Sequence, residues 1–298
     1  MFVATKYGQM INQLISKSWA LEERFHTVQA NLIMRRLARG EQALVIPDTE
    51  KPAPYATEPL AGFRDNNGIF HPWNKAAARG RSVAIIPIMG VMSRYGDMCS
   101  YGSEDIAGWI MEANAMDEIA AIVLEINSPG GQVDGTEMLG QVVKQSQKPV
   151  VAWVAGMAAS AAYWVASQAS EIMMESETSS EVGSIGVLAM HVDASGYYEK
   201  EGFKVSIIRA DGSEQKALFN DAEPLTEAVL SDTKAVLNPI RSSFVATVKS
   251  GRPKISDGVF SGKMYGGKEA IRLGMADRIG FLGDAVNRAA YLAGRTNQ

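Results

Sequence analysis

The longest run of residues without a charge is the feature that most constrains the fold of this chain. Between Lys148 and Glu171 there are 22 consecutive uncharged residues, 149–170. As one α-helix this run would be about 33 Å long, which is enough to cross a bilayer. Its internal pattern favours another interpretation, because residues 150–155 have the β-branched and aromatic character of a strand, Gly156 interrupts them, and small helix-forming residues follow. The run is therefore predicted to be a buried strand followed by a buried helix.

Strand-like and helix-like segments alternate along the chain from residue 82 onward. The strand-like segments are almost continuously apolar, which is typical of parallel strands covered on both faces. We therefore expect an α/β fold with a largely parallel sheet, covering helices and right-handed crossovers. The predicted strands are residues 83–92, 120–126, 150–155, 172–174, 187–190 and 204–209, and the predicted helices are residues 103–116, 135–146, 160–169, 194–201 and 225–248, the last partly divided at Pro239.

The part of the chain before residue 82 divides into two segments. In residues 1–45 apolar side chains recur at steps of three and four, which predicts an amphipathic helical arm for packing or partner binding. Charges interrupt the first 39 residues, so neither a secretory signal nor an N-terminal membrane anchor is expected. Five of the 11 prolines lie between residues 47 and 72, which indicates that residues 46–81 are a linker. Residues 82–298 are then expected to form one domain.

Charge and cysteine content exclude several classes of function. The chain has 29 basic and 33 acidic residues, a net charge of −4, so no general attraction to nucleic acid is expected. Its single cysteine, Cys99, can form neither an intrachain disulfide nor a thiolate metal site, and this favours a reducing, cytoplasmic location. Cys99 has no neighbouring base in the sequence, so we expect a packing residue or an exposed thiol rather than a nucleophile. No metal and no cofactor is predicted.

The segment Asn-Ser-Pro-Gly-Gly at residues 127–131 directly follows a predicted strand. Its paired glycines, Gly130 and Gly131, would let backbone N–H groups approach a ligand closely, as an oxyanion hole requires. An ordinary turn between a strand and a helix has the same composition.

Ser160 stands between alanines at the predicted junction of the buried strand and the buried helix. At the start of a helix its hydroxyl would meet the positive end of the helix dipole, and its small neighbours would leave room for a substrate backbone. These features suit a nucleophile. A helix-capping serine is the simpler alternative.

A serine nucleophile needs a base, and the chain has only three histidines. His26 lies on the predicted arm and His71 in the predicted linker, so both are expected at the surface. His191 follows the segment Gly-Ser-Ile-Gly-Val at residues 183–187, and a structural imidazole is its expected role. A lysine can replace histidine as the base, and Lys216 ends a polar segment further along the chain. A solvated loop lysine is the alternative there.

Taken together, these motifs resemble those of the signal peptide peptidase A-like serine peptidases, which use a Ser-Lys dyad on a Clp/crotonase-type α/β fold. The resemblance covers residues 82–283. It rests on residues 127–131, on Ala-Ala-Ser at residues 158–160, on residues 183–187, and on the tail segments Val-Phe-Ser-Gly at 259–262 and Ala-Ile-Arg-Leu-Gly-Met-Ala-Asp at 270–277.

The resemblance implies a role for each of eight residues. Ser160 would be the nucleophile and Lys216, 56 positions later (216 − 160), the general base. The N–H groups of Gly131 and Ala161 would form the oxyanion hole. The lysine must be neutral to accept the serine proton, and burial in a closed apolar site disfavours its charged form. The residues implied in substrate binding are Asn127, Gly130, Gly183 and Ser184.

Two departures from the membrane-associated members of this family point to a soluble branch. Those members commonly carry glycines after the nucleophile, where this chain has Ala161 and Ala162, and they have an N-terminal membrane anchor. The chain is more similar to the phage and prophage branch, whose members resemble head maturation proteases that cleave scaffold or portal-derived protein in the host cytoplasm or the immature capsid. In the family the base can come from a neighbouring protomer of a ring, so a ring-forming homo-oligomer is expected.

Several functions remain open at this stage. The favoured hypothesis is a serine endopeptidase of phage capsid maturation, and its closest rival is a cytoplasmic peptidase that degrades signal peptides or other polypeptides. A crotonase-like acyl-thioester enzyme would also use backbone amides at an oxyanion but would not depend on Ser160. An inactive assembly scaffold would keep the fold and have lost the activity.

Overall fold

The computed structural model describes residues 51–58, 82–97 and 100–296, together with the backbone of three short strands at residues 19–21, 62–64 and 70–72. Cys99 and His26 lie outside the described residues, as does most of the predicted arm. For His71 only the backbone is described.

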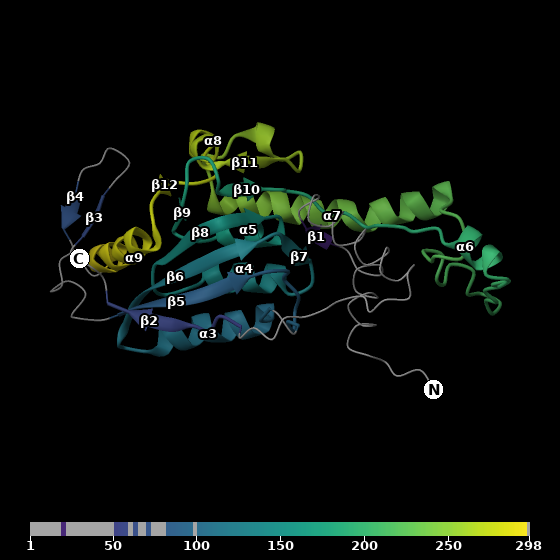
Figure 1. Ribbon diagram of the computed structural model, residues 1–298, viewed down its shortest axis with the longest axis horizontal. Helices are drawn as coiled ribbons and strands as arrows, with labels where there is room; N and C mark the ends of the chain where they lie inside the picture. The colour runs from purple at the N-terminus through teal and green to yellow at the C-terminus, as the bar shows by residue number, and fades with distance from the viewer. Residues whose placement is uncertain are drawn as a thin grey trace.

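A mostly parallel sheet forms the centre of the molecule (Figure 1). Its middle strands, β5 (Ser82–Met89), β6 (Ile119–Ser128) and β8 (Val150–Ala159), run parallel to one another in the order β5-β6-β8. At one edge β2 (Tyr55–Thr57) pairs antiparallel with β5. The main sheet therefore includes a strand from the range that the prolines assign to a linker.

The other edge of β8 is divided between two parallel partners. Its first half pairs with β9 (Glu171–Met174), and its last three residues pair with β10 (Glu181–Gly183). β9 in turn pairs with β12 (Arg278–Ile279), and β10 pairs antiparallel with β11 (Met264–Gly266). Ala158, the residue before the last of β8, is paired on both sides, with Ser128 of β6 and Val182 of β10, which fixes the position of the residues that follow it.

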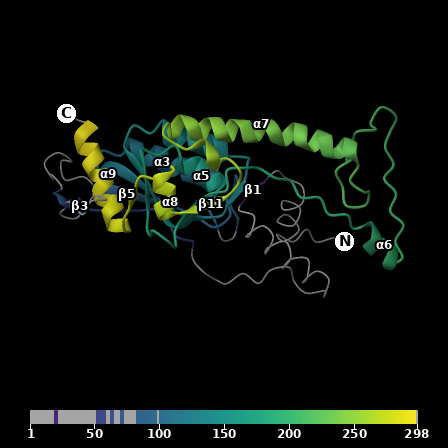
Figure 2. The same ribbon diagram turned by 90° about the horizontal axis from the view of Figure 1, so that it is seen from above.

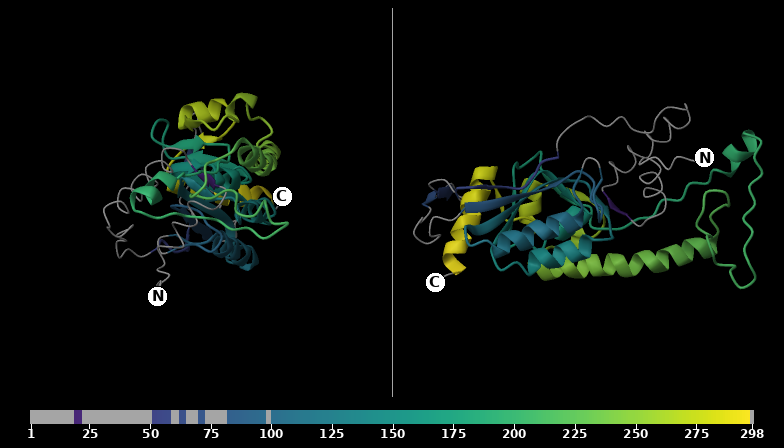
Figure 3. Two further views of the ribbon diagram at one scale, coloured as in Figure 1. Left: turned by 90° about the vertical axis from the view of Figure 1, so that its right-hand side faces the viewer. Right: turned by 90° about the horizontal axis from the view of Figure 1, so that it is seen from below.

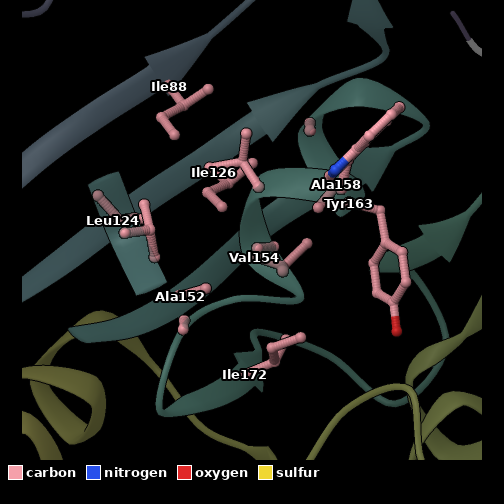
Figure 4. Packing of buried hydrophobic residues seen from close by; sticks show 14 of the residues in the cluster. Ile88, Leu124, Ile126, Ala152, Val154, Ala158, Tyr163 and Ile172 are labelled. Carbon is pink, nitrogen blue, oxygen red and sulfur yellow. The ribbon is translucent and has the colours of Figure 1, made fainter. Parts of the chain in front are cut away.

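Helices cover both faces of the sheet. Side chains alternate between the faces along each strand, and the strands carry apolar side chains on both, so each face needs a covering layer. On β6, Leu124 and Ile126 contribute to the larger core (Figure 4), whereas Val123 contributes to the other face. Buried alanines of α9 (Leu282–Thr296) cover that second face. The helices that contribute to the larger core are α3 (Ser103–Ala115), α4 (Thr136–Lys144), α5 (Ala161–Ala166), α7 (Glu227–Gly251) and α8 (Gly267–Arg272). The predicted α/β architecture is confirmed.

The uncharged run is divided between β8 and α5, as predicted. Every residue of α5 is buried, and its Trp164 stacks on Phe244 of α7 with ring centroids 4.4 Å apart. A helix that is apolar all round belongs in a protein core or a membrane. Of the residues that the structure describes, none belongs to a helix long and apolar enough to span a bilayer.

A long projection leaves the body between β10 and α8 (Figures 2 and 3). It contains an extended segment, the short α6 (Ser195–Lys200), a loop and the distal half of α7. Two predicted strands fall here and are wrong, because neither residues 187–190 nor residues 204–209 form a strand. The second segment is largely exposed, with Ile208 at 94%, and it pairs with none of the strands that the structure describes. α7 itself is continuous through Pro239 rather than divided there.

One described piece of the N-terminal region meets the body directly. Trp19–Leu21 form β1, which pairs antiparallel with β7 (Gly130–Gln132). These three residues are therefore a strand, where the apolar spacing predicts a helix. Gly62–Arg64 (β3) and Phe70–Pro72 (β4) form a separate two-stranded pair.

Candidate active site

Ser160 lies at the junction of β8 and α5 in an unusual backbone conformation. Its φ is 52° and its ψ is −116°, a region that side-chain-bearing residues rarely adopt and that costs about 1–3 kcal/mol. The residue is fully buried. Its side chain makes no capping hydrogen bond to α5, so the helix-cap interpretation does not account for this serine. Strain of this kind is found at functional sites.

Two carbonyl groups, one at the end of β10 and one in the segment that follows it, hold Ser160 in place. Its N–H donates to the Gly183 carbonyl at 2.8 Å, and its Oγ donates to the Gly186 carbonyl at 3.3 Å. In the parallel register Ala159 lies opposite Gly183, so Ser160 and Ser184 directly follow paired residues, and both have a φ of 52°. The motif at residues 183–187 thus lines one side of the serine.

Gly183 and Ser184 are in turn fixed by Lys263, which precedes β11. A side chain at Gly183 would overlap the Lys263 carbonyl oxygen, and the φ of Gly183 is 137°. The Ser184 N–H donates to that same carbonyl at 2.9 Å. Only glycine fits this position, which explains one glycine of the motif physically.

β7 provides the second part of the site. The N–H of Met92 donates to the Gly130 carbonyl at 2.8 Å, and the Gln132 N–H donates to the Met92 carbonyl at 2.9 Å. A side chain at Gly131 would overlap Met92, so the backbone approaches more closely here than any other residue allows. Gly130 has a φ of 92°, which also favours glycine.

Ser128 joins the two parts, and the motif analysis assigned it no role. Its Oγ donates to the Gly90 carbonyl at 2.6 Å and accepts from the Gly130 N–H at 3.1 Å. It lies opposite Ala158 in the β6–β8 register, two residues before Ser160. β7 also contacts α5, whose first amides, including that of Ala161, have no carbonyl of their own helix to bond. The structure therefore brings Ser160, Ala161 and Gly131 to one end of the sheet.

Asn127 reaches the same end of the sheet from β6. The residue is exposed, and its Oδ1 lies against Gly156 of β8, 2.8 Å from where a Cβ would stand. Its amide side chain thus lies beside the last part of β8, four residues before Ser160. This position is compatible with contact to a bound polypeptide.

Lys216 is not brought to Ser160 within this chain. It is exposed and lies in the loop between α6 and α7, at the end of the projection remote from α5 (Figure 1). Its carbonyl accepts from Arg209 Nε at 2.6 Å, and Arg209 also forms an ion pair with Glu223 at 2.7 Å. The backbone of this loop is therefore held by Arg209, while the lysine side chain is exposed.

The other groups expected to have no catalytic part are placed as follows. The His191 ring contacts Phe219 edge-on, and its Nε2 lies 2.6 Å from the Asn220 carbonyl, so it packs within the projection as a structural imidazole. Among the residues that the structure describes, no three His, Cys, Asp or Glu side chains gather in a way that could hold a metal ion.

The tail motif at residues 270–277 supports the site from behind. Asp277 forms a two-pronged ion pair with Arg252 at the end of α7, at 2.6 and 2.8 Å, and accepts from the Ile172 N–H of β9 at 2.7 Å. Tyr163 of α5 donates to the Met275 carbonyl at 3.0 Å, and burial raises the pKa of its phenol. The motif thus anchors α5, and with it the chain next to Ser160.

The sequence of this chain is similar to those of known peptidases. The model of the family "Peptidase family S49" matches residues 143–296, and that of "Clp protease" matches residues 92–180. "Protease 4" of Haemophilus influenzae is 29% identical over 219 residues, which cover 70% of this chain and 34% of that protein. "Head-tail preconnector protein GP5" of Enterobacteria phage P21 is 28% identical over 214 residues, covering 69% of this chain and 42% of GP5. "Capsid assembly protease C" of Escherichia phage lambda is 26% identical over 218 residues, covering 68% and 48%.

The chain spans about a third to a half of the length of these curated relatives. The S49 match alone includes more than half of the chain, and it contains the strained serine, the residues that hold it and the tail motif. This chain therefore belongs to peptidase family S49.

Proposed function

We propose that this protein is a serine endopeptidase with Ser160 as the nucleophile and Lys216 as the general base. The observation that carries the proposal is the strained, non-capping Ser160 at the β8–α5 junction, beside the glycine-lined β7. A serine with a capping role would have a hydrogen bond to α5, and a serine with only a packing role would not need a positive φ.

The proposed reaction follows acyl transfer to a serine. Ser160 Oγ attacks the carbonyl carbon of the scissile bond while neutral Lys216 takes its proton, and the N–H groups of Gly131 and Ala161 stabilise the oxyanion. The lysine then gives the proton to the leaving amine, which breaks the peptide bond and leaves an acyl-enzyme. Water, deprotonated by the same lysine, hydrolyses that ester and regenerates the serine.

We infer that Lys216 acts on Ser160 of a neighbouring protomer in a ring-forming homo-oligomer. The projection carries the lysine away from its own body and exposes large apolar side chains, including Phe203 at 64% and Ile208 at 94%. Apolar surface of this kind is stabilised by burial against a partner. A second copy of the chain is such a partner, and its Ser160 would receive Lys216 as the base. Placement among buried groups of that body would favour the neutral lysine.

The phage relatives support a role in capsid maturation. One is named for capsid assembly and one for the head-tail preconnector, and both align over about two thirds of this chain. We propose a scaffold or portal-derived protein as the substrate, cleaved in the host cytoplasm or the immature capsid. Degradation of signal peptides or other polypeptides is the alternative, and Protease 4 of Haemophilus influenzae aligns over a similar share.

The test compares Ser160→Ala, Lys216→Ala and, as a matched control, Lys200→Ala, which removes an exposed lysine from α6 of the same projection. Cleavage of a co-expressed scaffold protein and of a quenched fluorescent peptide is measured. We expect the first two variants to lose at least about a thousandfold in rate, as for loss of a nucleophile or its base, and Lys200→Ala to match wild type. Wild-type rates for Ser160→Ala would refute the proposal and leave the acyl-thioester and scaffold alternatives.

A mixing experiment tests where the lysine comes from. Ser160→Ala and Lys216→Ala chains are unfolded together, refolded and assayed. If the dyad crosses protomers, some mixed sites combine an intact serine with an intact lysine and activity returns. If the dyad forms within one chain, no mixed site is intact and the mixture stays inactive.

A further inference from the structure

β7 has one edge that the body uses and one that it does not. The used edge bonds to Met92 through the Gly130 carbonyl and the Gln132 N–H, at 2.8 and 2.9 Å. The N–H and C=O groups of successive residues in a strand point to opposite edges. The N–H and C=O of Gly131, the residue between them, therefore face the other edge.

That other edge is occupied by the N-terminal strand β1. The pairing is antiparallel, with Trp19 opposite Gln132, Ala20 opposite Gly131 and Leu21 opposite Gly130 (Figure 1). Ala20 is thus paired with the residue whose N–H is the proposed oxyanion donor. A backbone carbonyl at this place stands where the carbonyl of a scissile bond would be polarised.

We propose that Trp19–Leu21 is a built-in competitor for the outer edge of β7, where a polypeptide with its scissile carbonyl at the Gly131 N–H would lie as an antiparallel strand. The inference rests on the proposed peptidase function, and it adds that the chain's own N-terminal strand must leave before another polypeptide is cleaved. Addition of a strand to an open edge derives its affinity from main-chain hydrogen bonds and therefore accepts many sequences.

The dimensions of the pairing suit a displaceable segment. β1 has three residues, and among the described strands its partner is β7, which is itself three residues long. β7 is held by Met92 on its other edge, so β1 is the outer strand, and a pairing of three residues holds it with few hydrogen bonds. Because β1 already covers all three residues of β7, a substrate would replace it by pairing with β7 and making further contacts beyond this strand.

The test exploits the alternation of backbone groups along β1. Ala20→Pro removes the N–H that faces β7, whereas Trp19→Pro removes an N–H that faces away from it, a position where an edge strand tolerates proline. The two variants thus carry the same type of change one residue apart. Both are made in the full chain, with and without Ser160→Ala.

Two measurements are made on each variant. In the active background, we expect Ala20→Pro to raise kcat/KM for a quenched fluorescent peptide about tenfold, the upper end of the effect of losing one hydrogen bond, while Trp19→Pro stays within about twofold of wild type. In the Ser160→Ala background, amide hydrogen exchange is followed for a peptide that contains Gly131. Ala20→Pro should speed this exchange, and Trp19→Pro should not.

The outcomes separate this inference from the proposed function. Cleavage that depends on Ser160 but is equal in both proline variants, with equal exchange at Gly131, would overturn the competitor strand and leave the peptidase intact. Faster exchange in Ala20→Pro without any Ser160-dependent cleavage would support the docked strand while the peptidase proposal fails. Slower cleavage by Ala20→Pro than by Trp19→Pro would also overturn the inference, because β1 would then assist the substrate.

Discussion

The positive φ of Ser160 makes a measurable prediction about stability. Ser160→Ala and Ser160→Gly both lose the hydroxyl and its hydrogen bond to the Gly186 carbonyl, so this loss cancels when the two variants are compared. They differ only in the Cβ. Alanine keeps the strain of a φ of 52° and a ψ of −116°, and glycine relieves it.

The magnitude follows from a matched control one residue earlier. Ala159 is also fully buried but lies in the regular strand β8. Ala159→Gly should lower the free energy of unfolding by about 1–2 kcal/mol, from a lost buried methyl group and a more flexible unfolded chain. The exchange of alanine for glycine at position 160 carries the same cost, offset by about 1–3 kcal/mol of relieved strain. We therefore expect the change from alanine to glycine to lower the free energy of unfolding by about 1–3 kcal/mol less at position 160 than at position 159.

Equilibrium unfolding in urea, followed by tryptophan fluorescence, gives the four free energies required: wild type, Ala159→Gly, Ser160→Ala and Ser160→Gly. Equal costs of the alanine-to-glycine exchange at the two positions would refute the reasoning, since Ser160 would then store no strain. Ser160→Gly that is as stable as Ser160→Ala, or more so, would support it. Neither serine variant should cleave peptide.

Two further predictions concern the ion pairs behind the site. Burial raises the pKa of Glu171, but hydrogen bonds and charges from Arg288 and Arg278 outweigh burial, so its pKa in the folded protein is lowered. The ionised Glu171 therefore stabilises the fold above about pH 4.3, the value in the unfolded chain, and this contribution is lost as the pH falls through the lower folded value. Urea unfolding midpoints are measured between pH 7 and pH 3. The midpoint of Glu171→Gln should lie below that of wild type at neutral pH and approach it in acid. Glu112→Gln, on the exposed face of α3, should show no such change relative to wild type. Arg252→Leu should cost about 3 kcal/mol in urea unfolding because it leaves the Asp277 carboxylate without the guanidinium, whose own side chain is only 10% exposed. Arg272→Leu, whose side chain is 70% exposed, should leave the midpoint unchanged, and an equal loss in both would contradict the ion-pair argument.

The buried strands were predictable because they are paired on both edges and covered on both faces. Residues 150–155 are apolar without interruption and residues 120–126 are apolar except for Glu125, and the two segments lie within β8 and β6. The same rule failed in the projection, where residues 204–209 have strand-like composition but pair with no strand in the described part of the chain. Strand preference reflects packing and pairing more than the residue itself, so composition alone could not separate these cases.

The junction of strand and helix at position 160 was predictable, and most of the contacts that hold it were not. Small residues around position 160 mark the junction between strand and helix, and the structure confirms that junction. Three features depend on contacts between distant segments, and no local pattern reports them: the bridge made by Ser128, the clamp of Lys263 on Gly183, and the pairing of β1 with β7. The glycines are the one local signal, because each marks a close approach of backbone.

Small changes in the tilt of α7 produce large changes in the position of the loop that carries Lys216, the proposed base. The helix is anchored to α5 where Phe244 stacks on Trp164, and it extends 17 residues from that stack to its first residue, Glu227. At 1.5 Å per residue this lever is about 26 Å long, so a tilt of about 5° at the anchor moves its tip by about 2 Å, enough to make or break a hydrogen bond. In the proposed dyad, the alignment of Lys216 would therefore be set by the surface of the neighbouring protomer that receives the tip of the projection, and not by the packing of the body from which α7 extends.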